Sequence, residues 1–179
     1  MYFPEQDSYF LSNILKKELE SNKNLTFLDM GCGSCIQAKT AKKLGIKNIM
    51  CVDIDKDAIK QAKKSGFKAI NSNLFKKVKG KFDIIVFNPP YLPQHKYDKQ
   101  KDTSGGKLGD ETILAFLHQA KKHLNQNGKI FLLFSSLTPK TRINKIINPR
   151  YKFFRSIVTP QSDSFIFWQM LCFMCLHSP

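Results

Sequence analysis

Four consecutive residues, Asn88-Pro89-Pro90-Tyr91, combine side chains and rigidity that could hold a planar nitrogen group during a reaction. An amide or exocyclic amine nitrogen is a poor nucleophile because its lone pair is conjugated, so acceptors must hold its hydrogens and aim that lone pair. The side-chain carbonyl of Asn88 and the backbone carbonyl of Pro89 can do this. The prolines fix φ and donate no hydrogen bond, and the Tyr91 ring can pack on the planar group. These four residues are the candidate catalytic residues, although Asn-Pro-Pro would also end a strand.

A glycine-containing segment, Leu-Asp-Met-Gly-Cys-Gly-Ser at 28–34, is the second candidate site. Gly31 and Gly33 would let the backbone approach a ligand and expose amide donors at a helix start. Asp53 lies 22 positions after Gly31, near the spacing of a carboxylate that accepts ribose hydroxyls. The third glycine of NAD loops is missing, and Asp29 would repel a pyrophosphate. S-adenosylmethionine, with a ribose and a cationic amino-acid tail, fits better than a dinucleotide; a turn that binds nothing is the alternative.

Both segments must follow strands that end at one edge of a sheet. Short apolar runs alternate with lysine-rich amphipathic segments, which is typical of parallel strands covered by helices on both faces. Strands are predicted at 24–30, 48–53, 67–71, 82–87 and 128–134, followed by a final pair at 152–158 and 165–175. Helices are predicted at 7–19, 36–44, 56–65, 112–124 and 139–147, the first capped by Asp7 or Ser8.

The predicted fold class is α/β: a seven-stranded, mostly parallel, Rossmann-like sheet with helices on both faces and an antiparallel C-terminal hairpin. A length of 179 residues favours a single domain over residues 1–179. The long irregular stretch 92–110 contains Gly105, Gly106 and Gly109, and a loop of that length in a compact domain is usually functional.

Charge and cysteine content bound the cellular setting. The net charge is +15, and such a charge attracts polyanions. It is consistent with RNA contact through a basic surface, or with a lysine-rich composition that has no role in binding. The sequence has no signal peptide and no apolar run of about 20 residues, so we expect a cytoplasmic protein without membrane contact.

The five cysteines should then be reduced thiols. They include two C-x-x-C pairs, Cys32 with Cys35 and Cys172 with Cys175. Because the pairs are far apart in the sequence and the four histidines lack ligand spacing, no metal is expected.

Together these residues resemble the class I S-adenosylmethionine-dependent methyltransferases, and within them the HemK family of protein-glutamine N5-methyltransferases. The shorter archaeal and eukaryotic branch is most similar, because it opens with Tyr-x-Pro-x-x-Asp-Ser/Thr, which residues 2–8 match. The resemblance continues through 29–33, 53–55, 73–75 and 88–91. Residues 104–109, Ser-Gly-Gly-Lys-Leu-Gly, resemble the Gly-Gly-x-x-Gly stretch that follows in the family.

The resemblance implies a set of site residues and partners. The cofactor S-adenosylmethionine would be contacted by Ser8, Asp29, Gly31, Cys32, Gly33, Asp53, Ile54, Asn73, Leu74 and Asn88. A glutamine side chain would be held by Asn88, Tyr91, Gly105 and Gly106, without a metal. The family's substrate is the Gly-Gly-Gln motif of a translation release factor, and a small zinc-binding activator protein is an expected partner. There are three departures from the family pattern. Asn73 stands where the family often has an Asp that faces the adenine amine, although its carbonyl oxygen can still accept that hydrogen bond. Cys35 stands where a third glycine is common, and Thr103-Ser104 where the family usually has Trp-Ala.

Two other functions stay open. N-methylation of an exocyclic amine of adenine or guanine in RNA or DNA poses the same planar-nitrogen problem, and the net charge of +15 would favour a nucleic-acid substrate. A non-enzymatic scaffold that keeps the fold and binds without turnover is the third hypothesis.

Overall fold

Apolar runs form the parallel strands at the centre of the protein. The computed structural model describes residues 6–19, 22–91, 106–136, 138–148, 151–160 and 167–175, the last two ranges as backbone. The parallel strands are β1 (Thr26–Met30), β2 (Asn48–Asp53), β3 (Lys68–Asn71), β4 (Phe82–Phe87) and β5 (Leu124–Ser135). They lie side by side in the order β3-β2-β1-β4-β5. This arrangement confirms the predicted α/β, Rossmann-like fold with a parallel sheet.

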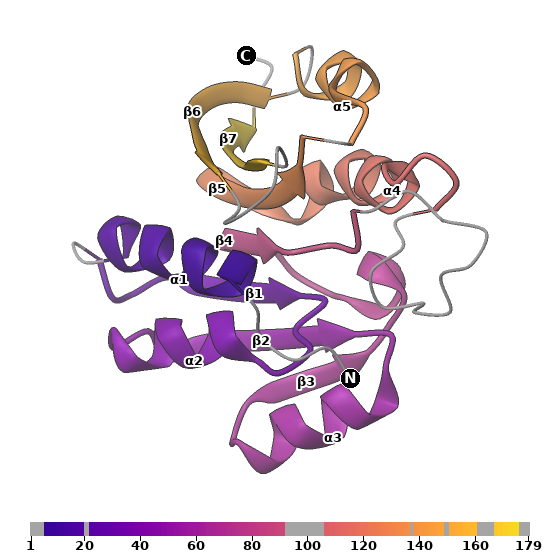
Figure 1. Ribbon diagram of the computed structural model, residues 1–179. Coiled ribbons are helices and arrows are strands. Elements are labelled where there is room, and N and C mark those ends of the chain that lie inside the picture. Colours follow the sequence, from indigo (N-terminus) through magenta and orange to yellow (C-terminus); the bar gives the residue numbers. More distant parts are fainter. Residues whose placement is uncertain are drawn as a thin grey trace.

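Two further strands extend the sheet beyond β5. β7 (Phe167–Cys175) pairs antiparallel with β5, and β6 (Tyr151–Pro160) pairs antiparallel with β7. The order across the seven strands is therefore β3-β2-β1-β4-β5-β7-β6 (Figure 1). β6 and β7 occupy the segments in which the sequence predicts a final pair of strands, and β7 lies between β5 and β6 although it follows both in the chain.

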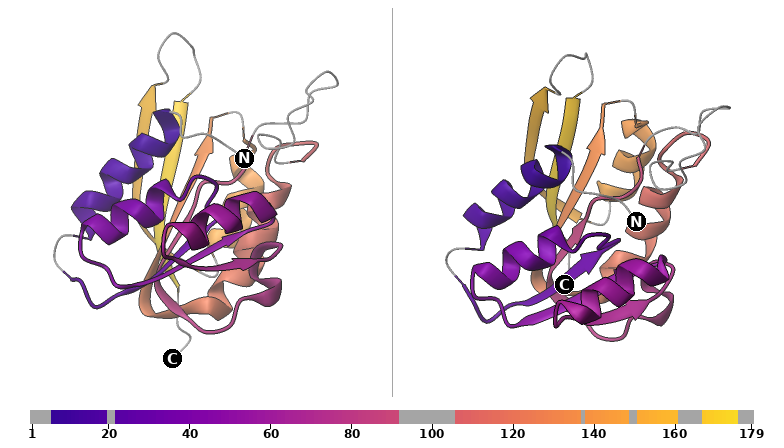
Figure 2. Two further views of the ribbon diagram at one scale, coloured as in Figure 1. Left: turned by 90° about the horizontal axis from the view of Figure 1, so that it is seen from below. Right: turned by 60° about the horizontal axis from the view of Figure 1, so that its bottom comes forward.

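Helices cover both faces of the sheet. They are α1 (Gln6–Glu18), α2 (Ile36–Lys43), α3 (Lys56–Lys64), α4 (Glu111–Ala120) and α5 (Lys140–Ile147), with short 3-10 helices η1 (Leu74–Lys77) and η2 (Lys121–His123). Figure 2 shows α1, α2 and α3 on one face, and α4 and α5 on the other. Side chains of a strand alternate between faces, so Phe27 packs against the first group and Leu28 against the second.

Local signals explain where α3 begins and ends. The Asp55 side chain caps the helix by accepting a hydrogen bond from the backbone of Asp57 at 2.9 Å. Gly66, with φ +79°, ends the turn after it. None of the helices in the described ranges is long and apolar enough to cross a membrane.

One predicted boundary is wrong. The helix predicted at 112–124 ends at Ala120, and the strand predicted at 128–134 begins at Leu124. Leu124 pairs with Phe82 of β4, and a register shift follows before Ile84 pairs with Lys129. Leu124 fits the spacing of the apolar face of the helix, so the periodicity of the sequence predicts that it is helical. In the structure its pairing with β4 places it in the sheet instead.

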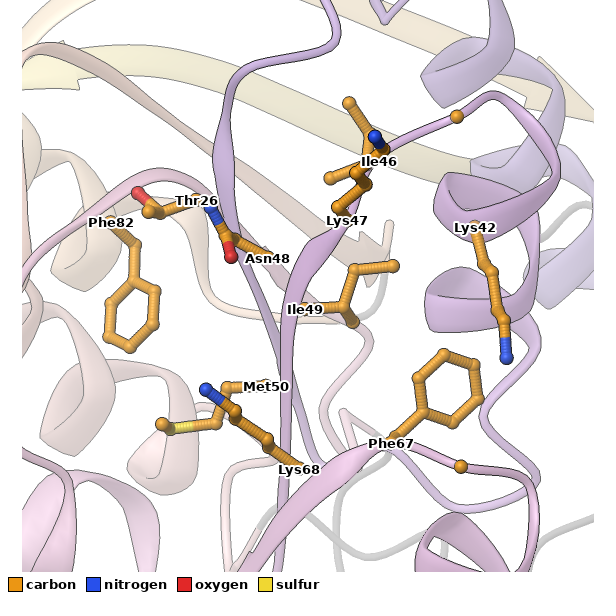
Figure 3. Close-up of a pocket in the computed structure, with 12 residues that line it drawn as sticks. Thr26, Lys42, Ile46, Lys47, Asn48, Ile49, Met50, Phe67, Lys68 and Phe82 are labelled. Carbon is orange, nitrogen blue, oxygen red and sulfur yellow. The ribbon is translucent and has the colours of Figure 1, made fainter.

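The amino-terminal ends of the strands form a different edge of the sheet. Asp83 joins three strands there: its carboxylate accepts hydrogen bonds from the backbone and hydroxyl of Thr26, at 2.8 and 2.7 Å, and from the Asn125 amide at 2.8 Å. Burial raises the pKa of Asp83, but these hydrogen bonds prevail and lower it. A hollow of about 820 Å³ lies at the same edge and includes Lys42, Lys47, Asn48 and Lys68 in its lining (Figure 3).

Candidate functional site

The carboxyl ends of β1, β2 and β4 bring three predicted site segments together. These strands are parallel neighbours in the order β2-β1-β4, so their carboxyl ends lie at one edge of the sheet. That edge carries residues 31–35 after β1, which we call the glycine loop, together with Asp53 at the end of β2 and the turn 88–91 after β4. Cys32 N donates to Val52 O at 3.1 Å, and Gly33 N donates to Asp53 Oδ2 at 2.8 Å. The glycine loop is thus tied to the end of β2.

Asp53 is the last residue of β2 at this edge. Its Oδ1 accepts a hydrogen bond from Asp55 N at 2.8 Å, and its Oδ2 accepts the one from Gly33. Burial raises the pKa of Asp53, and the backbone hydrogen bonds only partly offset that effect. Asn71, which sequence reasoning missed, donates to the carbonyls of Asp53 and Ile54 at 3.1 and 2.8 Å. The register partner of Asp53 in β3 is Asn71, a relation visible only once the strands are paired.

The glycine loop needs its glycines. Gly31 and Gly33 have φ of +61° and +47°, and a Cβ on Gly31 would lie 3.0 Å from Phe87 Cε2. Leu74, at the start of η1, also has a positive φ of +48° and is partly buried, whereas Asn73 before it is exposed. The predicted residues Asn73 and Leu74 follow β3, the strand beside β2.

Asp29 is a buried carboxyl beneath the glycine loop. It is 2% exposed, and its Oδ2 accepts a hydrogen bond from Ala38 N at 3.0 Å. Burial raises its pKa well above the usual value, and the nearby Cys35 raises it further. A cation bound beside Asp29 would favour the ionised form and lower that pKa again. This environment suits a ligand with an amino group.

The turn after β4 is held by the first helix. Asn88 Nδ2 donates to Asp7 Oδ2 at 3.1 Å and to Ser8 Oγ at 3.4 Å, and Tyr91 Oη donates to the same Asp7 oxygen at 3.0 Å. A carboxylate accepts hydrogen bonds, so Asp7 fixes which side of the Asn88 amide carries the nitrogen. The opposite atom, Asn88 Oδ1, is buried and accepts no hydrogen bond from any residue in the described ranges. It is an oriented acceptor.

Asp7 corrects the expectation for the start of the chain. The sequence predicts Asp7 or Ser8 as a helix cap, but α1 begins at Gln6 and both residues lie buried within its first turn. Gln37 of α2 fixes this turn by donating to Ser8 O at 2.9 Å, and it accepts from Ser12 Oγ at 2.9 Å. Sequence reasoning therefore missed Asp7 as the residue that orients the Asn88 turn.

The remaining predicted substrate residues are placed in part. Tyr91 is partly buried and packs against the apolar cores on both faces of the sheet, and its carbonyl accepts a hydrogen bond from Thr138 Oγ1 at 3.1 Å. Gly106 has φ +113°, and a Cβ there would collide with the Glu111 carboxylate. Gly105 lies outside the described residues.

The two C-x-x-C pairs have different surroundings. Cys32 and Cys35 lie in the glycine loop, and their neighbour is Cys51 of β2; all three are free and buried. Cys172 and Cys175 lie in β7. Hydrogen bonds with the Cys32 and Cys51 thiols lower the pKa of Cys35. Sequence spacing alone did not identify Cys51 as the third thiol.

The fold and the set of groups at its edge define the class of the protein, an S-adenosylmethionine-dependent methyltransferase. The chain belongs to the methyltransferase small domain family, whose model matches residues 6–158. It is similar to a Methanocaldococcus jannaschii protein provisionally named protein N5-glutamine methyltransferase, with 36% identity over 159 residues, 82% of this chain and 78% of that protein. These matches confirm the family predicted from the sequence.

A second relative and one solved structure are also similar to the chain. The chain is 32% identical over 147 residues to the release factor glutamine methyltransferase of Borreliella burgdorferi, covering 72% of this chain but 51% of that protein. The crystal structure of ribosomal protein L11 methylase from Lactobacillus delbrueckii subsp. bulgaricus has the same fold, with TM-score 0.73 and 22% identity over 97% of this chain and 81% of that one. The chain therefore spans about half the length of the Borreliella relative.

Proposed function

We propose that this protein transfers a methyl group from S-adenosylmethionine to the side-chain amide nitrogen of a glutamine in a translation release factor, acting as a single domain. The names of the Methanocaldococcus and Borreliella relatives support a glutamine substrate. The observation that carries the proposal is the oriented and buried Asn88 Oδ1, which the described residues leave without a donor. A primary amide of the substrate would supply that donor.

The residues at the strand ends fit the proposed cofactor. Asp29 offers a buried carboxylate to the amino group of the methionine part, and Asp53 retains acceptor capacity for ribose hydroxyls beside its two backbone hydrogen bonds. Ile54, which is 69% exposed, presents apolar surface next to Asp53. The remaining proposed contacts come from Ser8, Gly31, Cys32, Gly33, Asn73, Leu74 and Asn88. When bound, S-adenosylmethionine supplies an electrophilic methyl group.

The residues of the chain would prepare the nitrogen for attack. Asn88 Oδ1 would accept a hydrogen bond from one N–H of the substrate amide, and the Pro89 carbonyl would accept one from the other. These contacts would turn the nitrogen lone pair toward the methyl group of the cofactor and stabilise the positive charge that develops on the nitrogen. The Asp7 carboxylate, 3.1 Å from Asn88 Nδ2, polarises the Asn88 amide so that its oxygen becomes a stronger acceptor. The Tyr91 ring, held through its hydroxyl by Asp7, would pack on the planar amide.

The test compares three substrates under one set of conditions. Methyl-labelled S-adenosylmethionine is incubated with the protein and a release factor containing Gly-Gly-Gln, total RNA, or DNA, with and without the small zinc-binding activator implied by the resemblance. We expect label on the release factor, at the glutamine, and its loss in Asn88→Ala. Asn13→Ala is the matched control, because Asn13 is exposed on α1 and bonds only to Lys16 among the contacts described; it should retain activity.

The rival function has a clear signature in the same experiment. Label on RNA or DNA alone, declining steeply with salt, would replace the glutamine proposal by methylation of a base amine. Binding of S-adenosylmethionine in calorimetry without label on any substrate, in the presence of the activator, would favour a scaffold. In either case the calorimetric titration measures binding of S-adenosylmethionine independently of which substrate is methylated.

A further inference from the structure

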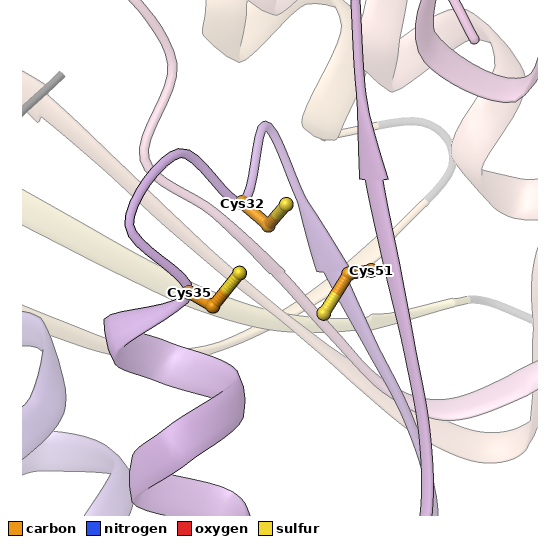
Figure 4. A group of neighbouring side chains, drawn as sticks. All are labelled: Cys32, Cys35 and Cys51. Carbon is orange, nitrogen blue, oxygen red and sulfur yellow. The ribbon is translucent and has the colours of Figure 1, made fainter. Parts of the chain in front are cut away.

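Three thiols converge where the glycine loop meets β2. Cys32 and Cys35 come from the loop and Cys51 from the strand, and their sulfur atoms all lie within 4.8 Å of one another. All three residues are buried, with exposures of 5%, 0% and 0%. Figure 4 shows Cys32 and Cys35 on the loop and Cys51 on the neighbouring strand. We call this group the thiol cluster.

Backbone conformation indicates that the thiol cluster is more than core packing. Cys35 has φ +61° and ψ 29°, in the left-handed region, which is strained for a residue with a side chain but not for glycine. Cys35 N also donates to Cys32 O at 2.6 Å, closing a tight turn. The turn therefore holds a strained cysteine at the position from which its sulfur meets Cys32 and Cys51.

We propose that Cys32, Cys35 and Cys51 form a binding site for one thiophilic d10 metal ion, with Zn²⁺ as its representative. Three protein ligands and one exogenous ligand are a common arrangement for zinc, and sulfur atoms bonded to one Zn²⁺ at about 2.3 Å lie roughly 4 Å apart. The sulfur atoms here need to approach one another by less than about 1 Å to reach that geometry.

Ligand chemistry and charge both favour this kind of ion. Thiolates select soft or borderline ions and disfavour Mg²⁺ and Ca²⁺. Three thiolates around a divalent ion leave one negative charge, and Lys39, whose Nζ donates to Ser34 O at 2.8 Å, acts electrostatically on Cys35 from the loop side. A regulatory disulfide is disfavoured because redox-sensing cysteines are solvent-accessible and these three are buried.

The proposed ion would fasten the glycine loop to β2. At present the described links between them are the hydrogen bonds Cys32 N to Val52 O and Gly33 N to Asp53 Oδ2. Metal–thiolate bonds would add a stronger connection next to both. This site goes beyond the proposed methyl transfer, since it does not depend on which substrate is methylated, and its test needs no activity.

The experiment titrates the full 179-residue protein, reduced with a phosphine, with Cd²⁺ and follows thiolate-to-metal charge-transfer absorbance. We expect saturation at one ion per chain, an absorption band that persists in excess Mg²⁺, and a higher midpoint of thermal unfolding with Zn²⁺. Absence of the absorption band, or displacement by Mg²⁺, would overturn the proposal.

Variants locate the ion. Cys35→Gly removes one ligand and relieves the left-handed strain, which offsets part of the cost of removing a buried side chain, so the metal-free variant should remain folded under the conditions of the titration. Its Cd²⁺ affinity should nevertheless fall at least about a hundredfold, because the loss of a residue that only hydrogen-bonds to a metal ligand can already lower metal affinity that much. Cys51→Ala should lose affinity in the same way, whereas Cys172→Ser, in β7, should bind as the parent does. Unchanged affinity in Cys35→Gly and Cys51→Ala, or loss of binding in Cys172→Ser, would refute the thiol cluster as the site.

Discussion

Asp7→Asn changes one atom of the network that orients Asn88. Asp7 Oδ1 accepts from Ser8 N, and Asp7 Oδ2 accepts from Asn88 Nδ2 at 3.1 Å and Tyr91 Oη at 3.0 Å. An amide nitrogen in either position would face a donor. If it takes the position of Oδ2, the least costly relief is for the Asn88 amide to turn over, which directs Nδ2 into the site and removes the acceptor that the substrate nitrogen needs.

The magnitude follows from the role of that acceptor. Removing one preorganised group that stabilises charge in a transition state costs about 2.7–4 kcal/mol, or roughly 10²–10³ in kcat. We therefore expect Asp7→Asn to lower kcat about a hundredfold. The dissociation constant of S-adenosylmethionine should change far less than kcat, because Asn88 is one of several proposed cofactor contacts and the Asp29 and Asp53 carboxylates are not altered.

The assay measures initial rates of methyl transfer to the release factor and, in parallel, cofactor affinity by calorimetry. Asp57→Asn is the matched control, since Asp57 lies exposed in the first turn of α3, and it should keep the parental kcat. A native kcat in Asp7→Asn would show that the Asn88 amide needs no orientation by Asp7. A low kcat accompanied by an equally weakened cofactor affinity would also refute the reasoning, because it would indicate collapse of the whole site.

Three other outcomes are expected. Gly31→Ala, which places a Cβ 3.0 Å from Phe87 at φ +61°, should lower the free energy of unfolding in urea by about 1–2 kcal/mol more than Gly80→Ala, where φ is +92° and no atom lies within 4 Å. The Asp83 carboxyl has a lowered pKa in the folded state. Its contribution to stability is therefore present above the ordinary Asp pKa and is lost as pH falls through the lowered pKa. Asp83→Asn should remove this part of the pH dependence of the free energy of unfolding in urea. Asp29 has a raised pKa in the folded state, so its contribution is present below the ordinary Asp pKa and is lost as pH rises through the raised value; Asp29→Asn should therefore increase the free energy of unfolding at neutral pH while weakening S-adenosylmethionine binding in calorimetry.

Local patterns in the sequence predicted the parts of the site that lie on one segment. The turn 88–91 and the glycine loop each follow an apolar strand, so a few adjacent residues predicted where both segments lie. The pairing of Asp53 with Gly33 was also accessible, because strands of one parallel sheet end at a common edge.

Contacts between distant segments were not accessible. Asp7 and Asn88 are 81 positions apart, and only the packing of α1 on α2 and the end of β4 brings them together. Cys51 was counted as one apolar residue of a strand, and its place beside Cys32 and Cys35 depends on the register of β2 against β1. The start of β5 was misplaced because Leu124 satisfies a helical period and a strand position equally well.

The position of β7 has a consequence for synthesis on the ribosome. Strand β5 ends at Ser135, whereas the strand that pairs with it, β7, spans Phe167–Cys175, and β6 emerges between them without a neighbour to bond. The nascent chain therefore exposes an unpaired apolar edge along β5 for the time needed to translate about thirty further codons, a few seconds at ordinary elongation rates. An exposed edge of this kind is a template for intermolecular pairing, so this interval is when the nascent protein depends most on shielding by the ribosome or a chaperone.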